Sequence, residues 1–483
     1  MVLESVKSKA QEPYLRKGSG SVGTECETLL VRQNRNSGAI VAPPIRENDR
    51  IFLEMQRLSR SAADIGEPYH LHATEESAYF GASEILTDMG HQIEKVNEKA
   101  GTISEAVENA VLSRRLVSQA AENLGLVHIA PGLLPFNAPN AKAIVGKTRY
   151  HMLAGLYNPD IYLMCINGSF QVHVKVGVDE AMDFLNVSQA ASVAEYAWFA
   201  NSPLLRGRET DYHTYRGMTW HMLIANDVDR RELDRGRVGI TGPYENWDSW
   251  TADLIGRSFL FTKRLTDKGV YRYLSIVGLP GTSNPGPYGV VTFKDYMEKG
   301  SAVAYDPLTK RTETIKFADI DLTMHMHTWW TESRLTGHGT IEDRSPDNSG
   351  KTVHIAAAIA FQKGLYHNLK EASEFADSFT IDELNRAAYM VKKHGFRHNG
   401  SDIAITNKKG ETMTIQQFCG RWIEIAERGL ALVGETRPWL DPVKQMTDDK
   451  RNDADVIIEL WRNKDLSERQ RNDRLLEIYR VDA

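Results

Sequence analysis

Stretches in which polar and apolar residues alternate predict β-strands at four places along the chain. They are residues 22–31, 79–87, 170–177 and 340–344. Successive side chains of a strand point to opposite faces, so each stretch turns polar side chains to one face. Those side chains are Glu25, Glu27, Glu84, Gln171, His173, Lys175, Glu342 and Arg344. Valines form the other face of 170–177, so the polar face is either an exposed sheet surface or the wall of a cleft.

Apolar residues at helical spacing predict helices over much of the remaining chain. The predicted helices are 46–70, 102–125, 147–158, 179–200, 293–300 and 351–364, followed by an almost wholly helical pattern over 371–483. Ser104 is expected to cap the second helix and Gly125 to end it. Asn167 and Gly168 are typical of a tight turn, which predicts a β-hairpin over 161–178.

The order of these elements predicts an α+β fold, with a mixed sheet region followed by a helical region. We expect three parts. Residues 1–20 are polar and are expected to be a flexible lead-in. Residues 21–365 would form the sheet-bearing domain, and 366–483 a helical region packed on the same domain.

Composition excludes several classes of protein. The 483 residues include 58 Lys and Arg against 64 Asp and Glu, and this net charge of -6 argues against a general nucleic-acid binder. Three widely spaced cysteines suggest neither a disulfide framework nor a zinc cluster, and they fit a reducing cytoplasm. The charged N-terminus has no apolar core typical of a signal peptide, and no apolar run is long enough to span a membrane. We therefore expect a soluble, cytoplasmic protein.

The polar strand faces carry candidate chemistry, and alternatives stay open at this level. Glu342 beside Arg344 could be an ordinary ion pair, or a metal ligand beside a phosphate-binding guanidinium. Glu25 and Glu27 would repel each other unless a cation or an arginine lies between them, but they could equally be solvated. The pair 325–327, His-Met-His, could bind a metal, although a polar strand face is preferred because no third ligand lies nearby in sequence.

Five motifs, taken in order, resemble the glutamate–cysteine ligase superfamily, closest to its plant and proteobacterial branch. They are Val22-Gly-Thr-Glu25-Cys-Glu27, Ser83-Glu84-Ile-Leu-Thr87, Phe199-Ala-Asn-Ser-Pro203 with Gly207 and Tyr215-Arg216 through Trp220, Arg334 with Glu342-x-Arg344-x-x-Asp347, and a tail from Glu427 to Trp461. The resemblance covers roughly residues 20–465, and several motifs in matching order are more specific than one. It implies a glutamine-synthetase-like fold: a curved, mostly antiparallel sheet with a concave active face and outer helices.

The resemblance also implies cofactors and roles for individual residues. It implies ATP and Mg²⁺, with Glu25, Glu27, Glu84 and Glu342 as the metal ligands. Arg344 would stabilise the transferred phosphate, and Arg216 and Arg334 would bind glutamate together with Tyr212 and Trp220. Gln171, His173 and Lys175 would contact the nucleotide. Either Gln171 matches the family's glutamine, which is preferred, or His173 and Lys175 match its histidine pair.

The implied function is an ATP-dependent ligase that activates the γ-carboxylate of glutamate as an acyl phosphate and couples it to an amine or amino acid. Its partners would be these small molecules, without nucleic acid or membrane, and a homodimer is left open. A related ligase acting on another carboxylic acid is the alternative. A guanidino kinase would need a reactive cysteine, and none of the three cysteines lies in such a context. A non-catalytic binding protein would be expected to have lost the acidic strand residues.

Overall fold

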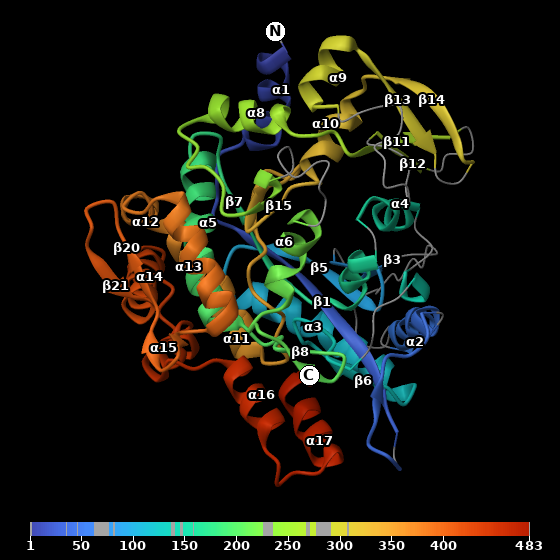
Figure 1. Cartoon of the computed structure of the whole chain (residues 1–483), viewed down its shortest axis with the longest axis vertical. Helices are drawn as coiled ribbons and strands as arrows, with labels where there is room; N and C mark the ends of the chain where they lie inside the picture. The colour runs from blue at the N-terminus through green and yellow to red at the C-terminus, as the bar shows by residue number, and fades with distance from the viewer. Residues whose placement is uncertain are drawn as a thin grey trace.

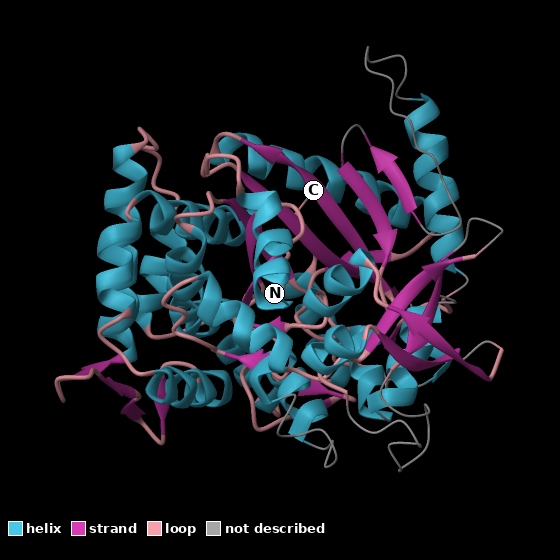
Figure 2. Ribbon diagram, turned by 90° about the horizontal axis from the view of Figure 1, so that it is seen from above, coloured by secondary structure: helices cyan, strands magenta, loops and turns pink. Residues whose placement is uncertain are grey.

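The computed structural model describes residues 2–482 except 35, 46, 62–76, 81–82, 137–140, 145–147, 158, 226–234, 267–270, 277–290 and 307–308. Its main sheet has nine strands in the order β16-β17-β7-β1-β5-β4-β3, with β2 and β6 also paired to β1. Every pairing in this sheet is antiparallel. The predicted α+β class is therefore confirmed, and Figure 2 shows the strands crossing the molecule with helices on their flanks.

The strands of the main sheet are β1 (Val22–Gln33), β2 (Ile40–Val41), β3 (Ser77–Phe80), β4 (Ser83–Thr87), β5 (Gln92–Ala100), β6 (Val127–Ile129), β7 (Phe170–Lys175), β16 (Ser333–Leu335) and β17 (Thr340–Asp343). A separate four-stranded sheet consists of β11 (Phe261–Leu265), β12 (Tyr271–Ser275), β13 (Ser301–Asp306) and β14 (Arg311–Lys316). Short pairs are β8 (Leu204–Leu205) with β9 (Arg208–Glu209), and β10 (Val238–Gly239) with β15 (Trp330–Thr331).

The helices before the C-terminal region are α1 (Val2–Gln11), α2 (Glu47–Ser61), α3 (Ile103–Asn123), α4 (Thr148–Tyr157), α5 (Ala181–Phe199), α6 (Thr219–Ala225), α8 (Trp247–Gly256), α9 (Phe293–Lys299), α10 (Asp319–Met326) and α11 (Thr352–His367). Most predicted helices are confirmed to within a few residues, although 62–70 lies outside the described residues. The cap of α3 is Thr102 rather than Ser104. Thr102 accepts from the Glu105 N–H while the Glu105 carboxylate reaches back to the Thr102 N–H, so both free amides are bonded.

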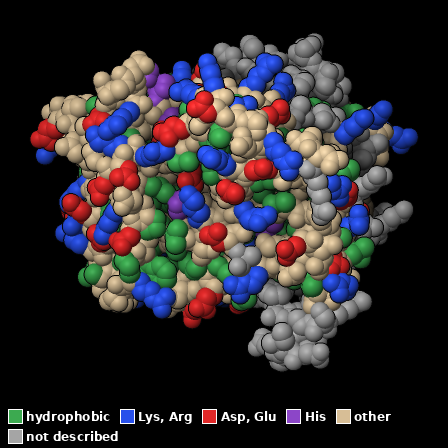
Figure 3. Space-filling view, turned by 90° about the horizontal axis from the view of Figure 1, so that it is seen from below, with side chains coloured by type: hydrophobic (Ala, Val, Ile, Leu, Met, Phe, Trp, Pro, Cys, Tyr) green, Lys and Arg blue, Asp and Glu red, His purple; other side chains and the backbone are tan. Residues whose placement is uncertain are grey.

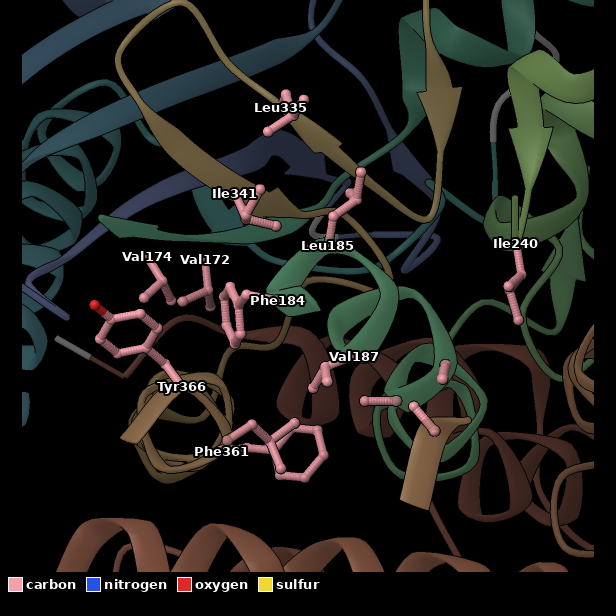
Figure 4. Close-up of a cluster of buried hydrophobic side chains, with 14 of the residues drawn as sticks. Val172, Val174, Phe184, Leu185, Val187, Ile240, Leu335, Ile341, Phe361 and Tyr366 are labelled. Carbon is pink, nitrogen blue, oxygen red and sulfur yellow. The ribbon is translucent and has the colours of Figure 1, made fainter. Parts of the chain in front are cut away.

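The apolar face of the main sheet packs on α5 and α11. Val172 and Val174 of β7 and Ile341 of β17 are buried against Phe184 and Phe361 from these helices (Figure 4). Full burial of one such side chain stabilises the fold by about 1.5–3 kcal/mol, so this layer holds the strands in place. The opposite face of the same strands is therefore free to carry polar side chains.

The C-terminal region packs on this layer rather than standing apart. Its helices are α12 (Leu369–Ala376), α13 (Ile381–His394), α14 (Ile415–Leu432), α15 (Asp441–Asp449), α16 (Asp453–Arg462) and α17 (Glu468–Tyr479). Gly429 of α14 meets Gly364 of α11 so closely that a Cβ at Gly429 would lie 1.8 Å from the Gly364 carbonyl oxygen. One hydrophobic cluster joins β1 and β7 to α14 and α15. Figure 1 shows α12, α13, α14 and α15 together on one side of the molecule.

The tail also contains strands that the sequence analysis missed. They are β18 (Arg397–His398), β19 (Ser401–Asp402), β20 (Ala404–Thr406) and β21 (Thr412–Thr414). Asn399 and Gly400 both have positive φ, at 50° and 78°, and form the tight turn between β18 and β19. An Asn-Gly pair is a strong hairpin signal, so the prediction of an almost wholly helical tail is wrong.

The N-terminal residues form a docked helix instead of the predicted flexible lead-in. Val6 and Ala10 of α1 are buried, and the Tyr14 ring packs edge-on against Trp247 of α8 at 5.4 Å. The Tyr14 hydroxyl accepts from the Thr336 N–H at 2.9 Å and shares its proton between carbonyl oxygens on the β16–β17 hairpin. Apolar residues spaced four apart were the overlooked signal, because charged residues between them make the segment polar on average.

Three other predicted strands differ. Residues 79–87 form the two strands β3 and β4 rather than one. Pro159–Ile166 is a 3-10 helix and not the first strand of a hairpin, because β1 and β17 already occupy both edges of β7. His325 lies in α10, buried and bonded through Nε2 to the Leu254 carbonyl at 2.8 Å, so the expected histidine pair on a strand does not exist. No helix in the described ranges has the length and apolarity needed to cross a bilayer.

Candidate functional site

A cleft of about 710 Å³ lies on the polar face of the main sheet. Tyr271 and Tyr273 from β12, Arg149 from α4 and Trp220 from α6 complete its walls. Strand register explains which side chains meet there. Arg334, Glu342 and His173 form one row across β16, β17 and β7, and Gln171 and Glu25 are paired across β7 and β1.

Glu342 is held by two guanidinium groups at the floor of the cleft. Arg334 donates from Nε to Oε2 at 2.6 Å and from Nη2 to Oε1 at 3.1 Å. Arg344 donates to the same Oε1 through Nη1. Burial alone would raise the Glu342 pKa, but the two arginines hold it well below its ordinary value. The carboxylate is therefore charged, and both of its oxygens are engaged.

Glu25, His173 and Glu342 form a group whose ligand atoms all lie within 4.8 Å of one another. His173 Nε2 lies 3.1 Å from Glu25 Oε1, yet it is buried and completes no hydrogen bond. Burial lowers the His173 pKa, but the Glu25 carboxylate raises it more, and the same contact lowers the Glu25 pKa against the effect of burial. A buried nitrogen without a bond between two carboxylates fits a divalent cation, and the two glutamates are the donors that magnesium prefers.

Glu27 lies two residues beyond Glu25 on the same face of β1, at the junction of the cleft with a smaller neighbouring cavity. It accepts from the Ser169 N–H at 2.9 Å and from Gln171 Nε2 at 3.4 Å. Burial, with the nearby Asp88 charge, raises the Glu27 pKa to about 7. Of the four predicted metal ligands, the structure thus brings Glu25, Glu27 and Glu342 to one cleft.

Glu84, the fourth, does not line the cleft. It lies in the same row of the sheet as Glu25, but β5 separates the two strands. Two strand spacings, about 10 Å, therefore separate the backbones that carry Glu84 and Glu25. Glu94 of β5 lies directly opposite Glu27 and does line the cleft. Glu94 was not predicted from the sequence, although the period-two pattern around it was the available signal.

Two of the predicted nucleotide contacts are in the cleft and one is not. Gln171 accepts from Arg344 Nη1 at 3.2 Å, and His173 belongs to the group described above. Lys175 is instead bonded through Nζ to the carbonyl oxygens of Pro13 at 2.9 Å and His338 at 3.0 Å. Because the N-terminal segment docks here, it draws the Lys175 ammonium away from the cleft.

The smaller cavity contains Arg216 but not Arg334. Arg216 donates to the carbonyl oxygens of Arg344 at 2.9 Å and Ser345 at 3.2 Å, and it lies 3.7 Å from the Asp347 carboxylate. The two arginines expected to share one pocket therefore line adjoining cavities, and the Arg344 side chain reaches both.

Trp220 is also at the junction, stacked on Trp330 at 3.9 Å with an interplanar angle of 8°. Tyr212 lines neither cavity and packs beside Tyr215 with ring centroids 5.8 Å apart. Its position in a loop near the signature residues was therefore insufficient to place it at the site. Trp330 was missed because it belongs to no motif.

Asp347 explains why the two signature segments belong together. Its carboxylate accepts from Ser202 Oγ at 2.7 Å, Thr214 Oγ1 at 2.9 Å and the Asn201 N–H at 3.0 Å. It thereby joins the loop after α5 to the segment after β17, and it lies beside Arg216. Asp347 positions the Arg216 loop.

The cysteines offer no reactive thiol. Cys26, Cys165 and Cys419 are all buried, and burial raises the pKa of each, to about 12 for Cys165. None of the three lines either cavity. The reactive cysteine that a guanidino kinase would require is therefore not found here.

Comparisons with known proteins point to one family. The family model described as glutamate-cysteine ligase family 2 matches residues 21–473. A Nocardioides protein provisionally named glutamate–cysteine ligase 2-1 is 26% identical over 135 residues, which are 27% of this chain and 34% of that protein. The match thus spans about a third of the length of this curated relative.

Among solved structures, the glutamate–cysteine ligase of Francisella tularensis in complex with AMP aligns over 96% of this chain and 88% of its own. The TM-score is 0.56 at 14% sequence identity, so this likeness concerns the fold. It agrees with the sheet architecture that the sequence resemblance implied.

Proposed function

The chain belongs to glutamate-cysteine ligase family 2, a family of ATP-dependent ligases that form C–N bonds, and from this we propose that it joins the γ-carboxylate of glutamate to an amine. The observation that carries the proposal is the arrangement around Glu342. One carboxylate, bound by Arg334 and Arg344, lies beside Glu25 and His173 on the floor of a cleft large enough for a nucleotide and a small substrate.

Each charged group has a part in this proposal. Magnesium-ATP would supply the phosphoryl group, and the carboxylates of Glu25 and Glu342, with Glu27 lining the same cleft, are the oxygen donors suited to hold the metal. Arg344 faces both cavities, so its guanidinium can stabilise negative charge where phosphate and carboxylate meet. Glu342 fixes that guanidinium in place before any substrate binds, and such preorganisation lowers the barrier to phosphoryl transfer.

The proposed order of chemistry is activation, then coupling. The γ-carboxylate attacks the terminal phosphate of ATP, forming an acyl phosphate and releasing ADP. The amine then attacks the acyl carbon, phosphate leaves, and the amine nitrogen loses a proton. The buried thiols fit the reducing cytoplasm, where we expect the protein to act.

Hydroxylamine tests this order without knowledge of the natural amine. With L-glutamate and Mg-ATP, we expect γ-glutamyl hydroxamate to form together with equal amounts of ADP and phosphate. Release of AMP and pyrophosphate would instead show that the activated intermediate is an adenylate and not an acyl phosphate. If other dicarboxylic acids gave hydroxamate and glutamate did not, the related ligase acting on another acid would be the correct function.

Glu27→Gln tests the metal site. We expect weaker binding of Mg-ATP in a folded protein, because the variant keeps the shape of the side chain but loses a charge that a cation requires. Glu122→Gln, at an exposed position of α3, is the matched control. An unchanged Mg-ATP affinity at the wild-type melting temperature would remove Glu27 from the metal site.

A further inference from the structure

In the part of the chain that the structure describes, Arg149 is the arginine of the cleft whose guanidinium has no acceptor. Arg334 and Arg344 are both bonded to Glu342. Arg149 lines the same cleft, yet among the described residues it makes neither a hydrogen bond nor an ion pair, and its Nε is buried. The centroid of the Tyr150 ring lies 5.2 Å from the Arg149 Cζ. A buried guanidinium nitrogen without an acceptor is costly, which suggests that a ligand supplies one.

Carboxylates surround this guanidinium without binding it. Asp88 accepts a hydrogen bond from the Tyr150 hydroxyl, and Asp88, Glu94, Tyr150 and Arg149 all line the cleft. Burial lowers the Arg149 pKa, but the fields of Tyr150, Asp88, Tyr273 and Glu94 raise it more. The group is therefore a permanent cation in a partly acidic wall.

The mixture of charges favours a particular ligand. A polyphosphate would gain from Arg149 but would be repelled by Asp88 and Glu94. The head group of an α-amino acid carries one carboxylate and one ammonium, and it can satisfy both signs at once. An arginine fork binds a carboxylate with direction, and an aspartate is a matching acceptor for an ammonium.

The position of this wall favours binding of the carboxylate substrate there rather than of the amine acceptor. Besides burial, the Asp88 charge raises the Glu27 pKa. Burial lowers the His327 pKa, the Arg334 and Arg149 charges lower it further, and the Glu342 charge raises it. The wall lines the same cleft as Glu27 and Arg344. A substrate held there by its head group would turn a distal carboxylate toward Arg344.

We propose that Arg149 binds the α-carboxylate of the glutamate substrate and Asp88 its α-ammonium. This assignment rests on the proposed ligase function. It replaces Arg216 and Arg334 as the readers of the head group, because those two guanidinium groups are already engaged within the protein.

The proposal is tested by combining substitutions of Arg149 and Asp88 with substrates that lack the group each residue would bind. Steady-state kinetics with hydroxylamine as acceptor are measured for wild type, Arg149→Met, Arg149→Lys and Asp88→Asn. The substrates are L-glutamate, γ-aminobutyrate, which lacks the α-carboxylate, and glutarate, which lacks the α-amine. Arg115→Met, at an exposed position of α3, is the control for loss of an arginine.

We expect Arg149→Met to raise the glutamate KM by about thirtyfold or more, the effect of removing one partner of a desolvated charge pair. The γ-aminobutyrate KM should change by less than about threefold, because that substrate has no group for Arg149 to bind. Asp88→Asn should raise the glutamate KM but leave the glutarate KM unchanged, because glutarate has no α-ammonium for Asp88 to bind. Arg149→Lys should recover only part of the loss, since an ammonium lacks the planar fork.

The outcomes separate this assignment from the proposed function. Failure of the wild-type protein to form γ-glutamyl hydroxamate overturns the ligase proposal itself. If the wild type is active and Arg149→Met keeps its glutamate KM, the head-group assignment is wrong. A selective rise in the ATP KM would assign Arg149 to phosphate, and a selective rise in the hydroxylamine KM to the acceptor. Thermal stabilisation by L-glutamate alone, present in wild type and lost in folded Arg149→Met, would support the assignment without turnover.

Discussion

At the scale of single residues, Glu342 is a buried carboxylate whose charge depends on two partners. Leaving a buried charge wholly uncompensated costs about 3–5 kcal/mol. Because Arg344 still pairs with Glu342, we expect Arg334→Ala to lower the free energy of unfolding by less, about 1.5–3 kcal/mol, and to weaken Mg-ATP binding. Arg334→Lys should be intermediate, because it keeps the charge without the fork. Chemical denaturation measures the first effect, and unchanged stability of Arg334→Ala would contradict this account of Glu342.

A second buried charge lies behind the sheet, away from the cleft. Lys95 of β5 is completely buried and donates to Thr28 Oγ1 and, at 3.3 Å, to the Ile93 carbonyl. His128 Nε2 lies 2.8 Å from the same Thr28 oxygen. Burial lowers the Lys95 pKa to about 7, with the Arg114 charge acting in the same direction and Cys26 and Glu94 opposing it.

This shift predicts a pH dependence of stability. Between about pH 7 and the ordinary lysine value near 10.4, the unfolded chain binds a proton that the folded chain lacks. The free energy of unfolding contributed by Lys95 should therefore rise with pH across this window. Lys95→Met should remove that rise, and Lys99→Met, exposed on the same strand, should keep it. Urea denaturation at several pH values measures both, and identical profiles for Lys95→Met and wild type would refute the shift.

At the scale of elements, the N-terminal helix holds the hairpin that carries Arg334 and Glu342. The Tyr14 hydroxyl bonds to backbone groups at both ends of the β16–β17 turn. Tyr14→Phe removes these hydrogen bonds, while the Thr336 N–H keeps its bond to the Thr340 carbonyl and the Thr336 carbonyl its bond from the Gly339 N–H, so the cost should be about 0.5–1.5 kcal/mol. We expect a lower free energy of unfolding and faster amide exchange in 333–343, with little change elsewhere. Equal exchange protection in that segment would show that α1 docks without supporting the hairpin.

The distribution of charge on the face in Figure 3 reflects the composition of the chain. The face in Figure 3 interleaves Lys and Arg with Asp and Glu side chains. This agrees with the composition, in which 58 Lys and Arg stand against 64 Asp and Glu.

At the scale of the whole molecule, the C-terminal region reaches the smaller cavity. Lys392 of α13 is buried and donates to Glu332 at 2.6 Å, and its carbonyl accepts from the N–H groups of His213 and Thr214 in the Arg216 loop. Although burial would raise the Glu332 pKa, Lys392 holds it well below its ordinary value. One lysine thus joins the tail, a buried cavity carboxylate and the loop that carries Arg216.

Lys392→Met should therefore act on both stability and the site. We expect a loss of about 3–5 kcal/mol in the free energy of unfolding, because Glu332 is left buried without its cation. Adding Glu332→Gln should restore part of this loss, since the uncompensated charge is then gone. Lys393→Met, at the neighbouring, partly exposed position, is the control. If the double variant were no more stable than Lys392→Met, the pair would not be the cause.

The sequence by itself determined most of the elements and the polar sheet face. The helices α3, α5 and α11 and the strands β1, β7 and β17 follow from local periodicity, which depends on neighbours within a few residues. The same periodicity placed Glu25, Glu27, His173 and Glu342 on strand faces. Segments that contradict their average composition, such as α1 and the β18–β19 hairpin, were not recognised.

Only the tertiary structure decided which charges meet and which remain without a partner. Arg334 and Glu342 are paired because β16 and β17 are adjacent, and Lys175 leaves the cleft because residues 12–14 dock beside it. Arg149 lacks an acceptor among the described residues, and its wall is formed by β4, β5 and α4, which are far apart in sequence. Pairing energies of buried charges depend on distances of a few ångströms across such segments, and no local pattern encodes those distances.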